Sequence, residues 1–196
     1  MRKILFSGSL AAFLLMSLLV QARAQRGESN GNGGESEVQR GFAIAPVTLN
    51  LVGKNPSLVG LGSYLVNGPG DCIGCHTGGG LFLMGGDPFQ GQTAIVNTAN
   101  YLAGGAAFGP FISRNLTPDR NGRPAGLTLE QFKLVLRTGV DLKAIPPGVP
   151  NSPGLLQVMP WPQFRHSTDR DLEAIYEYLR SIPCKEGGPG LPPNRC

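Results

Sequence analysis

Two cysteines and a histidine offer the clearest chemistry in this 196-residue chain. Two residues separate Cys72 from Cys75, and His76 follows the second cysteine directly. This spacing is typical of a c-type haem attachment site, where each thiol adds to one vinyl group and the histidine becomes the proximal iron ligand. The sequence therefore predicts one haem c, bound covalently through Cys72 and Cys75 and ligated by His76.

Three other kinds of site share part of this pattern. A zinc ribbon needs a second pair of cysteine or histidine ligands, whereas the remaining cysteines, Cys184 and Cys196, lie far downstream. A thioredoxin-like redox pair accompanies a βαβ pattern, which this sequence does not show. A disulfide between Cys72 and Cys75 themselves is sterically awkward and rare. We therefore favour haem attachment, provided that the chain is exported.

The N-terminus has the order of a secretory signal peptide. Arg2 and Lys3 precede an apolar run, and small residues occupy positions 22 and 24. This order predicts a signal peptide over residues 1–24, cleaved after Ala24. An uncleaved membrane anchor is the alternative, because the apolar run is long enough for one. Either interpretation places the folded part in the periplasm or another exported location, and cleavage leaves no membrane span.

Removal of residues 1–24 changes the charge balance. The whole chain carries 17 basic and 13 acidic residues, a formal charge of +4. The predicted signal peptide holds Arg2, Lys3 and Arg23 and no acidic residue, which leaves 14 basic and 13 acidic residues and a formal charge of +1. We see no basic run and no groove-reading helix, so nothing favours nucleic-acid binding, and we exclude that class.

The 172 residues after position 24 suffice for one ordinary domain. Residues 25–45 begin with a polar, glycine-rich stretch, which predicts a flexible linker with order beginning between Gly41 and Pro46. The folded domain is expected over 46–183, followed by a tail at 184–196. Glycine and proline number 29 and 17, so a loop-rich domain of this size needs a further source of core, which a buried porphyrin supplies.

Three helices are predicted from apolar periodicity and end signals. They are expected at about 57–66, 129–137 and 169–181. Their expected N-caps are Ser57, Thr128 and either Ser167 or Thr168. Between His76 and Leu127 the sequence shows no clear helix, and only 93–96 suggests a strand. We therefore predict an all-α fold, a bundle of three to four helices around one covalent haem, with a long glycine-rich loop that wraps it.

The sixth iron ligand in haem electron carriers is commonly methionine, because a soft thioether favours ferrous iron and raises the potential. The candidates after the attachment motif are Met84, Met159 and His166. Met159 lies in an apolar, proline-stiffened segment just before the last helix, so it is the expected ligand. Core filling is its structural alternative. Met84 is expected to line the haem pocket, and His166 to be exposed or to cap a helix.

Taken together, these motifs resemble the class I monohaem cytochromes c. The resemblance is greatest to bacterial cytochromes that serve as subunits of, or electron acceptors for, periplasmic dehydrogenases. The matching strings are 62–66, 71–77, 113–119, 129–132, 136–139, 159–161 and 169–180. The resemblance implies a cytochrome c-like fold, haem c, and His76 and Met159 as axial ligands. It also implies that the first and last helices cross, and we expect Gly62 near Tyr176 at that crossing.

The expected function is one-electron transfer by a periplasmic carrier. The chain is not expected to be an enzyme by itself, but it can be the cytochrome subunit of a dehydrogenase. Its expected partners are redox proteins on the dehydrogenase or terminal oxidase side. Two alternatives stay open. One is a haem enzyme subunit or a gas or redox sensor with an open sixth position, and the other is a non-catalytic interaction module.

Further expectations concern residues that line the haem pocket and the two cysteines of the tail. Four residues are candidates for lining the pocket or binding the propionates, although each has a structural alternative: Arg114, Asn115, Thr117 and Trp161. Cys184 and Cys196 are expected to form a disulfide, because such cysteines outside the cytoplasm usually pair. Two free thiols, or a bond to another molecule, are the alternatives.

Overall fold

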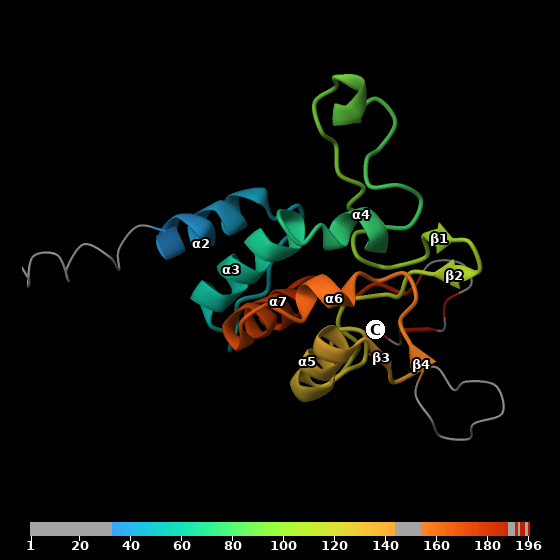
Figure 1. The fold of residues 1–196 in the computed structure, drawn as a ribbon. Coiled ribbons are helices and arrows are strands. Elements are labelled where there is room, and N and C mark those ends of the chain that lie inside the picture. Colours follow the sequence, from blue (N-terminus) through green and yellow to red (C-terminus); the bar gives the residue numbers. More distant parts are fainter. Residues whose placement is uncertain (1–32, 144–153, 188–190, 192, 195) are drawn as a thin grey trace, which may run out of the picture. The chain divides into compact units, whose positions relative to one another are not determined.

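The computed structural model describes residues 33–143, 154–187, 191, 193–194 and 196. The predicted signal peptide, its cleavage site after Ala24 and the start of the predicted linker lie outside these residues. The chain divides into two compact units, Met1–Ser36 and Glu37–Cys196, and the second carries the fold. Its helices are α2 (Gly33–Ile44, which begins in the first unit), α3 (Pro56–Asn67), α4 (Cys72–His76), α5 (Leu129–Thr138), α6 (Trp161–Phe164) and α7 (Asp169–Ser181) (Figure 1).

The described residues are mostly helical, which is compatible with the predicted all-α, cytochrome c-like fold. Two antiparallel pairs of two-residue strands are present: β1 (Ala107–Phe108) with β2 (Phe111–Ile112), and β3 (Val140–Asp141) with β4 (Gly154–Leu155). A 3-10 helix, η1 (Pro88–Gln90), lies in the long loop. The strand expected at 93–96 does not form, and only Val96 pairs, through an isolated bridge to Phe82.

The core forms where α3 and α7 pack together (Figure 1). Gly62 of α3 faces Ala174 and Tyr178 of α7, and a Cβ at position 62 would collide with the carbonyl oxygen of Ala174. Only glycine lets the two backbones come this close. The expected crossing is therefore present, but Ala174 and Tyr178 make the contact with Gly62 rather than Tyr176.

Replacing Gly62 by alanine is expected to destabilise the domain by about 1–3 kcal/mol, because the added methyl group forces the two helices apart. Ser57→Ala is the matched control, since Ser57 lies exposed in the first turn of the same helix and its loss should change stability little. Chemical denaturation of both variants, in the same haem state as the parent, measures the difference. A Gly62→Ala variant as stable as the parent would contradict the close approach.

Local signals explain the ends of the main helices. A capping box begins α5 at Thr128, as predicted, and Gly139 ends α5 in the left-handed conformation. Thr168, one of the two N-caps expected for α7, begins that helix with a second capping box. The N-cap of α3 is Asn55 rather than Ser57. The side chain of Asn55 accepts from the backbone N–H groups of Ser57 and Leu58, at 3.0 and 3.4 Å. Proline in the first turn, at position 56, moves the helix start upstream of the expected cap.

Helix α2 occupies residues that the sequence assigns to a flexible linker. Gly41 lies against Gly60 of α3, and the buried hydroxyl of Ser63 donates to the carbonyl oxygen of Gly41 at 2.7 Å. Order thus begins before the start expected between Gly41 and Pro46. In the described part of the chain, every helix is too short or too polar to cross a bilayer.

Candidate cofactor site

Helix α4 carries both cysteines and the histidine. Because Cys72 and Cys75 are three residues apart in one helix, their side chains share a face. His76 ends the helix, one turn after Cys72. Both thiols are free, so the pair does not form the rare disulfide considered above. The five-residue helix therefore presents two sulfur atoms and one imidazole from adjacent positions.

The surroundings of the two thiols raise the pKa of both. Burial, followed by the nearby Asp71 carboxylate, raises the pKa of the Cys72 thiol to about 12. The same two causes raise the pKa of the Cys75 thiol. These directions are opposite to the lowered pKa that is typical of redox-active dithiols and thiolate metal ligands. No group of three or more His, Cys, Asp or Glu side chains in the described residues is arranged to hold a metal ion.

The ring of His76 is oriented by a backbone carbonyl. Its Nδ1 lies 2.7 Å from the carbonyl oxygen of Arg114. Because a carbonyl oxygen can only accept, Nδ1 carries the proton and donates. Burial lowers the pKa of His76, which keeps the imidazole neutral and leaves Nε2 with a lone pair. Histidines that bind metals use this arrangement, since the second nitrogen fixes the tautomer and the orientation of the ring.

The long loop after α4 returns to support this hydrogen bond. The N–H of Gly104 donates to the carbonyl oxygen of His76 at 2.8 Å, and Leu116 N–H donates to the carbonyl oxygen of Leu102 at 2.9 Å. Gly104 has a φ of +72°, and a Cβ there would lie 2.5 Å from the carbonyl carbon of Arg114. Glycine at position 104 thus lets the loop lie against the segment that holds His76. Motif reading missed this residue.

Met159 lies between β4 and α6, partly buried and packed against the core. Its carbonyl oxygen accepts from the N–H of Trp161 at 2.8 Å, in the first turn of α6. Packing of this kind suits an iron ligand and also a core methionine, so the sixth ligand stays a prediction. Residues 144–153, which precede β4, lie outside the described part.

The two other candidates for the sixth ligand are both exposed. Met84 has 101% of its reference accessibility, so the expectation that it lines a pocket is wrong for this structure. It follows Phe82 and Leu83 in the glycine-rich loop. Their apolar run suggested a buried segment, although Leu83 is also exposed, at 47%. His166 is exposed in the turn between α6 and α7, in agreement with one of the two roles expected for it.

Trp161 connects the methionine segment with α5. A Cβ at Gly139, the residue that ends α5, would collide with the indole ring. The ring therefore lies directly on the backbone turn at Gly139, and Trp161 is half-buried there. This contact brings the start of α6, and with it Met159, to the C-terminal end of α5. A role for Trp161 in lining a haem pocket stays a prediction.

The other predicted pocket residues already have protein partners. Arg114 forms an ion pair with Asp141. The Nδ2 of Asn115 donates to the carbonyl oxygen of Lys185 at 2.8 Å, and its Oδ1 accepts from the backbone N–H and the hydroxyl of Thr117, at 2.8 and 2.7 Å. Thr117 is fully buried. These bonds give Asn115 and Thr117 a structural role, and their part in binding propionates stays a prediction.

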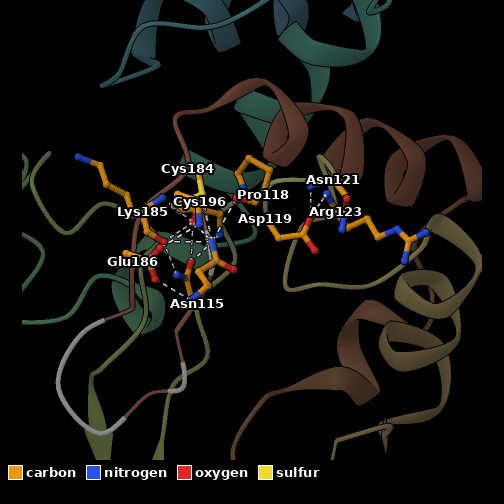
Figure 2. The surroundings of a disulfide bond; sticks show 11 residues. Asn115, Pro118, Asp119, Asn121, Arg123, Cys184, Lys185, Glu186 and Cys196 are labelled. Carbon is orange, nitrogen blue, oxygen red and sulfur yellow. Dashed lines mark hydrogen bonds between the residues drawn. A yellow bond between two sulfur atoms is a disulfide. The ribbon is translucent and has the colours of Figure 1, made fainter.

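The C-terminal cysteines form the predicted disulfide. Cys184 and Cys196 are bonded, with their Cα atoms 5.6 Å apart. Figure 2 shows the bridge beside Asn115, Pro118 and Lys185, so it lies next to the segment that follows Arg114. The tail is therefore attached beside the segment whose Arg114 carbonyl accepts from His76.

A cavity of about 600 Å³ borders α4 at Ile73. Tyr64 and Pro69 line it from the end of α3 and the turn after it, and Phe82 and Val96 line it from the long loop. Among the described residues, its lining does not include the two cysteines, His76 or Met159. The cavity thus lies beside α4 and not at the expected iron ligands.

Several known proteins that resemble this chain are cytochrome subunits of bacterial dehydrogenases. It is 30% identical to the cytochrome c subunit of gluconate 2-dehydrogenase from Pantoea cypripedii over 125 residues, 64% of this chain and 23% of that protein. It is 31% identical to the cytochrome c subunit of a quinone alcohol dehydrogenase from Gluconobacter oxydans (strain 621H) over 137 residues, 68% of this chain and 26% of the relative. It is 30% identical to the fructose dehydrogenase cytochrome subunit of Gluconobacter japonicus over 111 residues, which are 56% of this chain and 18% of that protein.

The chain spans about a quarter or less of the length of these relatives. No protein-family model matches it, and no solved structure was found to match it. The similarity nevertheless agrees with the chemistry of α4, and it supports a cytochrome c-type protein.

Proposed function

We propose that this chain binds one haem c covalently and serves as a periplasmic one-electron carrier. The observation that carries the proposal is the hydrogen bond from His76 Nδ1 to the carbonyl oxygen of Arg114. It leaves Nε2 available to iron on the helix that also presents two free thiols. The similarity to dehydrogenase cytochrome subunits supports the same conclusion.

Each residue then has a defined task. Cys72 and Cys75 would hold the porphyrin to α4 through thioether bonds, and His76 would bind the iron through Nε2. Met159 would supply the other ligand, and its proline-flanked, partly buried segment would limit the entropy lost when the sulfur is held in place. The Arg114 carbonyl fixes the imidazole and raises its donor strength. When bound, haem c supplies reversible one-electron redox chemistry.

The proposed setting follows from the predicted export signal over residues 1–24 and from the relatives. These relatives are cytochrome subunits of dehydrogenases, so we propose a dehydrogenase as the electron donor and an acceptor on the terminal oxidase side. The chain itself would carry out no catalytic reaction, and its single attachment motif corresponds to one haem.

A redox titration of the exported, haem-loaded protein tests this function. We expect one reversible one-electron step, a ferric spectrum with the weak thioether-to-iron band, and poor carbon monoxide binding after reduction. A haem sensor or haem enzyme with an open sixth position would instead bind carbon monoxide readily and lack the thioether band. An irreversible titration, or none, would refute the carrier function.

A further inference from the structure

The C-terminal tail packs on the chain segment that supplies the hydrogen-bond acceptor of His76. The Nδ2 of Asn194 lies 3.1 Å from the hydroxyl oxygen of Thr117, 3.1 Å from the carbonyl oxygen of Pro118 and 3.0 Å from that of Lys185. One side-chain amide thus lies at hydrogen-bond distance from three acceptors on two segments of the chain.

The backbone of Lys185 adds two more hydrogen bonds between the tail and the segment at residues 115–117. Its N–H donates to the hydroxyl of Thr117 at 3.1 Å, and its carbonyl oxygen accepts from the amide of Asn115 at 2.8 Å. Thr117 is fully buried, so water cannot replace a partner that its hydroxyl loses. The position of the 115–117 segment therefore depends on the tail as well as on its own fold.

The disulfide keeps these tail residues in place. Cys184 directly precedes Lys185, and Cys196 follows Asn194 by two residues. Between them, the carboxylate of Glu186 accepts from the backbone N–H groups of Asn194 and Cys196, at 2.8 Å each. Without the covalent bridge, hydrogen bonds alone would hold Asn194 in place.

The tail contacts a residue that is next in sequence to the hydrogen-bond acceptor of His76. Asn115 directly follows Arg114, whose carbonyl oxygen accepts the hydrogen bond from His76 Nδ1–H. The other anchors of this segment are the Arg114–Asp141 ion pair and the hydrogen bond from Leu116 to Leu102. They remain when the tail is loosened, so the expected result is a shifted carbonyl rather than an unfolded site.

We infer that Asn194, held by the Cys184–Cys196 bridge, is a positioning residue for the proximal histidine. It keeps the Arg114 carbonyl at hydrogen-bond distance from His76 and so maintains the donor strength of Nε2 toward the iron. This inference rests on the proposed haem-binding function. It assigns the tail a role in setting the reduction potential, beyond its role as a structural crosslink.

Two altered proteins test the inference in the haem-loaded state: Asn194→Ala, and the double variant Cys184→Ser, Cys196→Ser. A weaker Nδ1–H···O bond makes the imidazole a poorer donor and stabilises ferric iron less. We therefore expect a more positive midpoint potential in both. We also expect the Nδ1 proton of His76, followed by NMR, to exchange with solvent several-fold faster than in the parent.

Thr128→Ala provides the matched control, because it removes a helix-capping hydroxyl of α5 that makes no bond to the tail. It should lower stability and leave both readouts unchanged. If the tail variants keep the parent's potential and proton exchange, this inference is overturned while the carrier function stands. If the parent protein itself carries no covalent haem, the proposed function fails first.

Discussion

Replacing Met159 by alanine is expected to open the sixth coordination position of the haem-loaded protein. The ferric thioether band should disappear, and the reduced protein should bind carbon monoxide readily. The midpoint potential should fall, because the soft thioether no longer favours ferrous iron. The fall should be a sizeable part of the roughly 0.8 V over which axial ligands set haem potentials. Absorption spectroscopy and redox titration measure all three effects.

Met84→Ala is the control for that experiment. It removes the same kind of side chain from a fully exposed position, so the spectrum, the carbon monoxide affinity and the potential should match those of the parent. His166→Ala, at another exposed position, should also leave these three properties unchanged. A Met159→Ala protein with the parent's spectrum would show that another residue is the ligand, and a change in either control would identify it.

Replacing both Cys72 and Cys75 by serine is expected to abolish covalent haem attachment completely, since no thiol remains on α4 to form a thioether bond. Any pigment still held by His76 should pass into acidified acetone. Each single serine variant keeps one thiol and should retain part of the attachment. Haem staining of the denatured chains after electrophoresis gives the result for each variant.

The Cys184→Ser, Cys196→Ser protein is the matched control for covalent attachment. It removes the same number of sulfur atoms, but from the disulfide of the tail, so its haem should stay covalently bound even if its potential shifts. Retained haem stain in the Cys72→Ser, Cys75→Ser protein would contradict the assignment of the attachment site. Equal loss of stain from both double variants would contradict it as well.

Much of the fold could be predicted wherever the signal was local. Thr128 and Thr168 each begin a helix with a capping box, and a stripe of apolar residues marks the buried face of α7, so the bounds of α5 and α7 were predicted closely. Helix α2 could not be predicted in this way. Its order depends on Gly41 lying against Gly60, a contact with another helix that leaves no periodic pattern in either segment.

In the candidate site, too, adjacent residues could be predicted from the sequence, whereas a contact between distant residues could not. The three residues of α4 are adjacent in sequence, and their spacing alone indicates the chemistry. The acceptor for His76 lies 38 residues away, at the carbonyl of Arg114, and a backbone carbonyl has no sequence signature. Arg114 and Asn115 were predicted as pocket residues from their side chains, whereas their observed contacts are an ion pair with Asp141 and a bond to the tail.

The long loop explains the wrong expectation for Met84. Apolar residues at 81–84 suggested a buried lining, but η1 and the glycine turns hold the segment together mainly through backbone and polar side-chain bonds. The N–H of Leu83 donates to the carbonyl oxygen of Ile95, and Asp87 accepts from the N–H of Phe89. A loop stabilised by its own hydrogen bonds can leave apolar side chains exposed, which composition alone does not reveal.

Covalent haem attachment can be decided from the intact mass of the exported protein under denaturing conditions. We expect a coloured chain that begins at Gln25 and carries the mass of one intact haem, which neither acid nor organic solvent removes. A colourless chain with the mass of the polypeptide alone, purified from cells that attach haem to other c-type cytochromes, would contradict it.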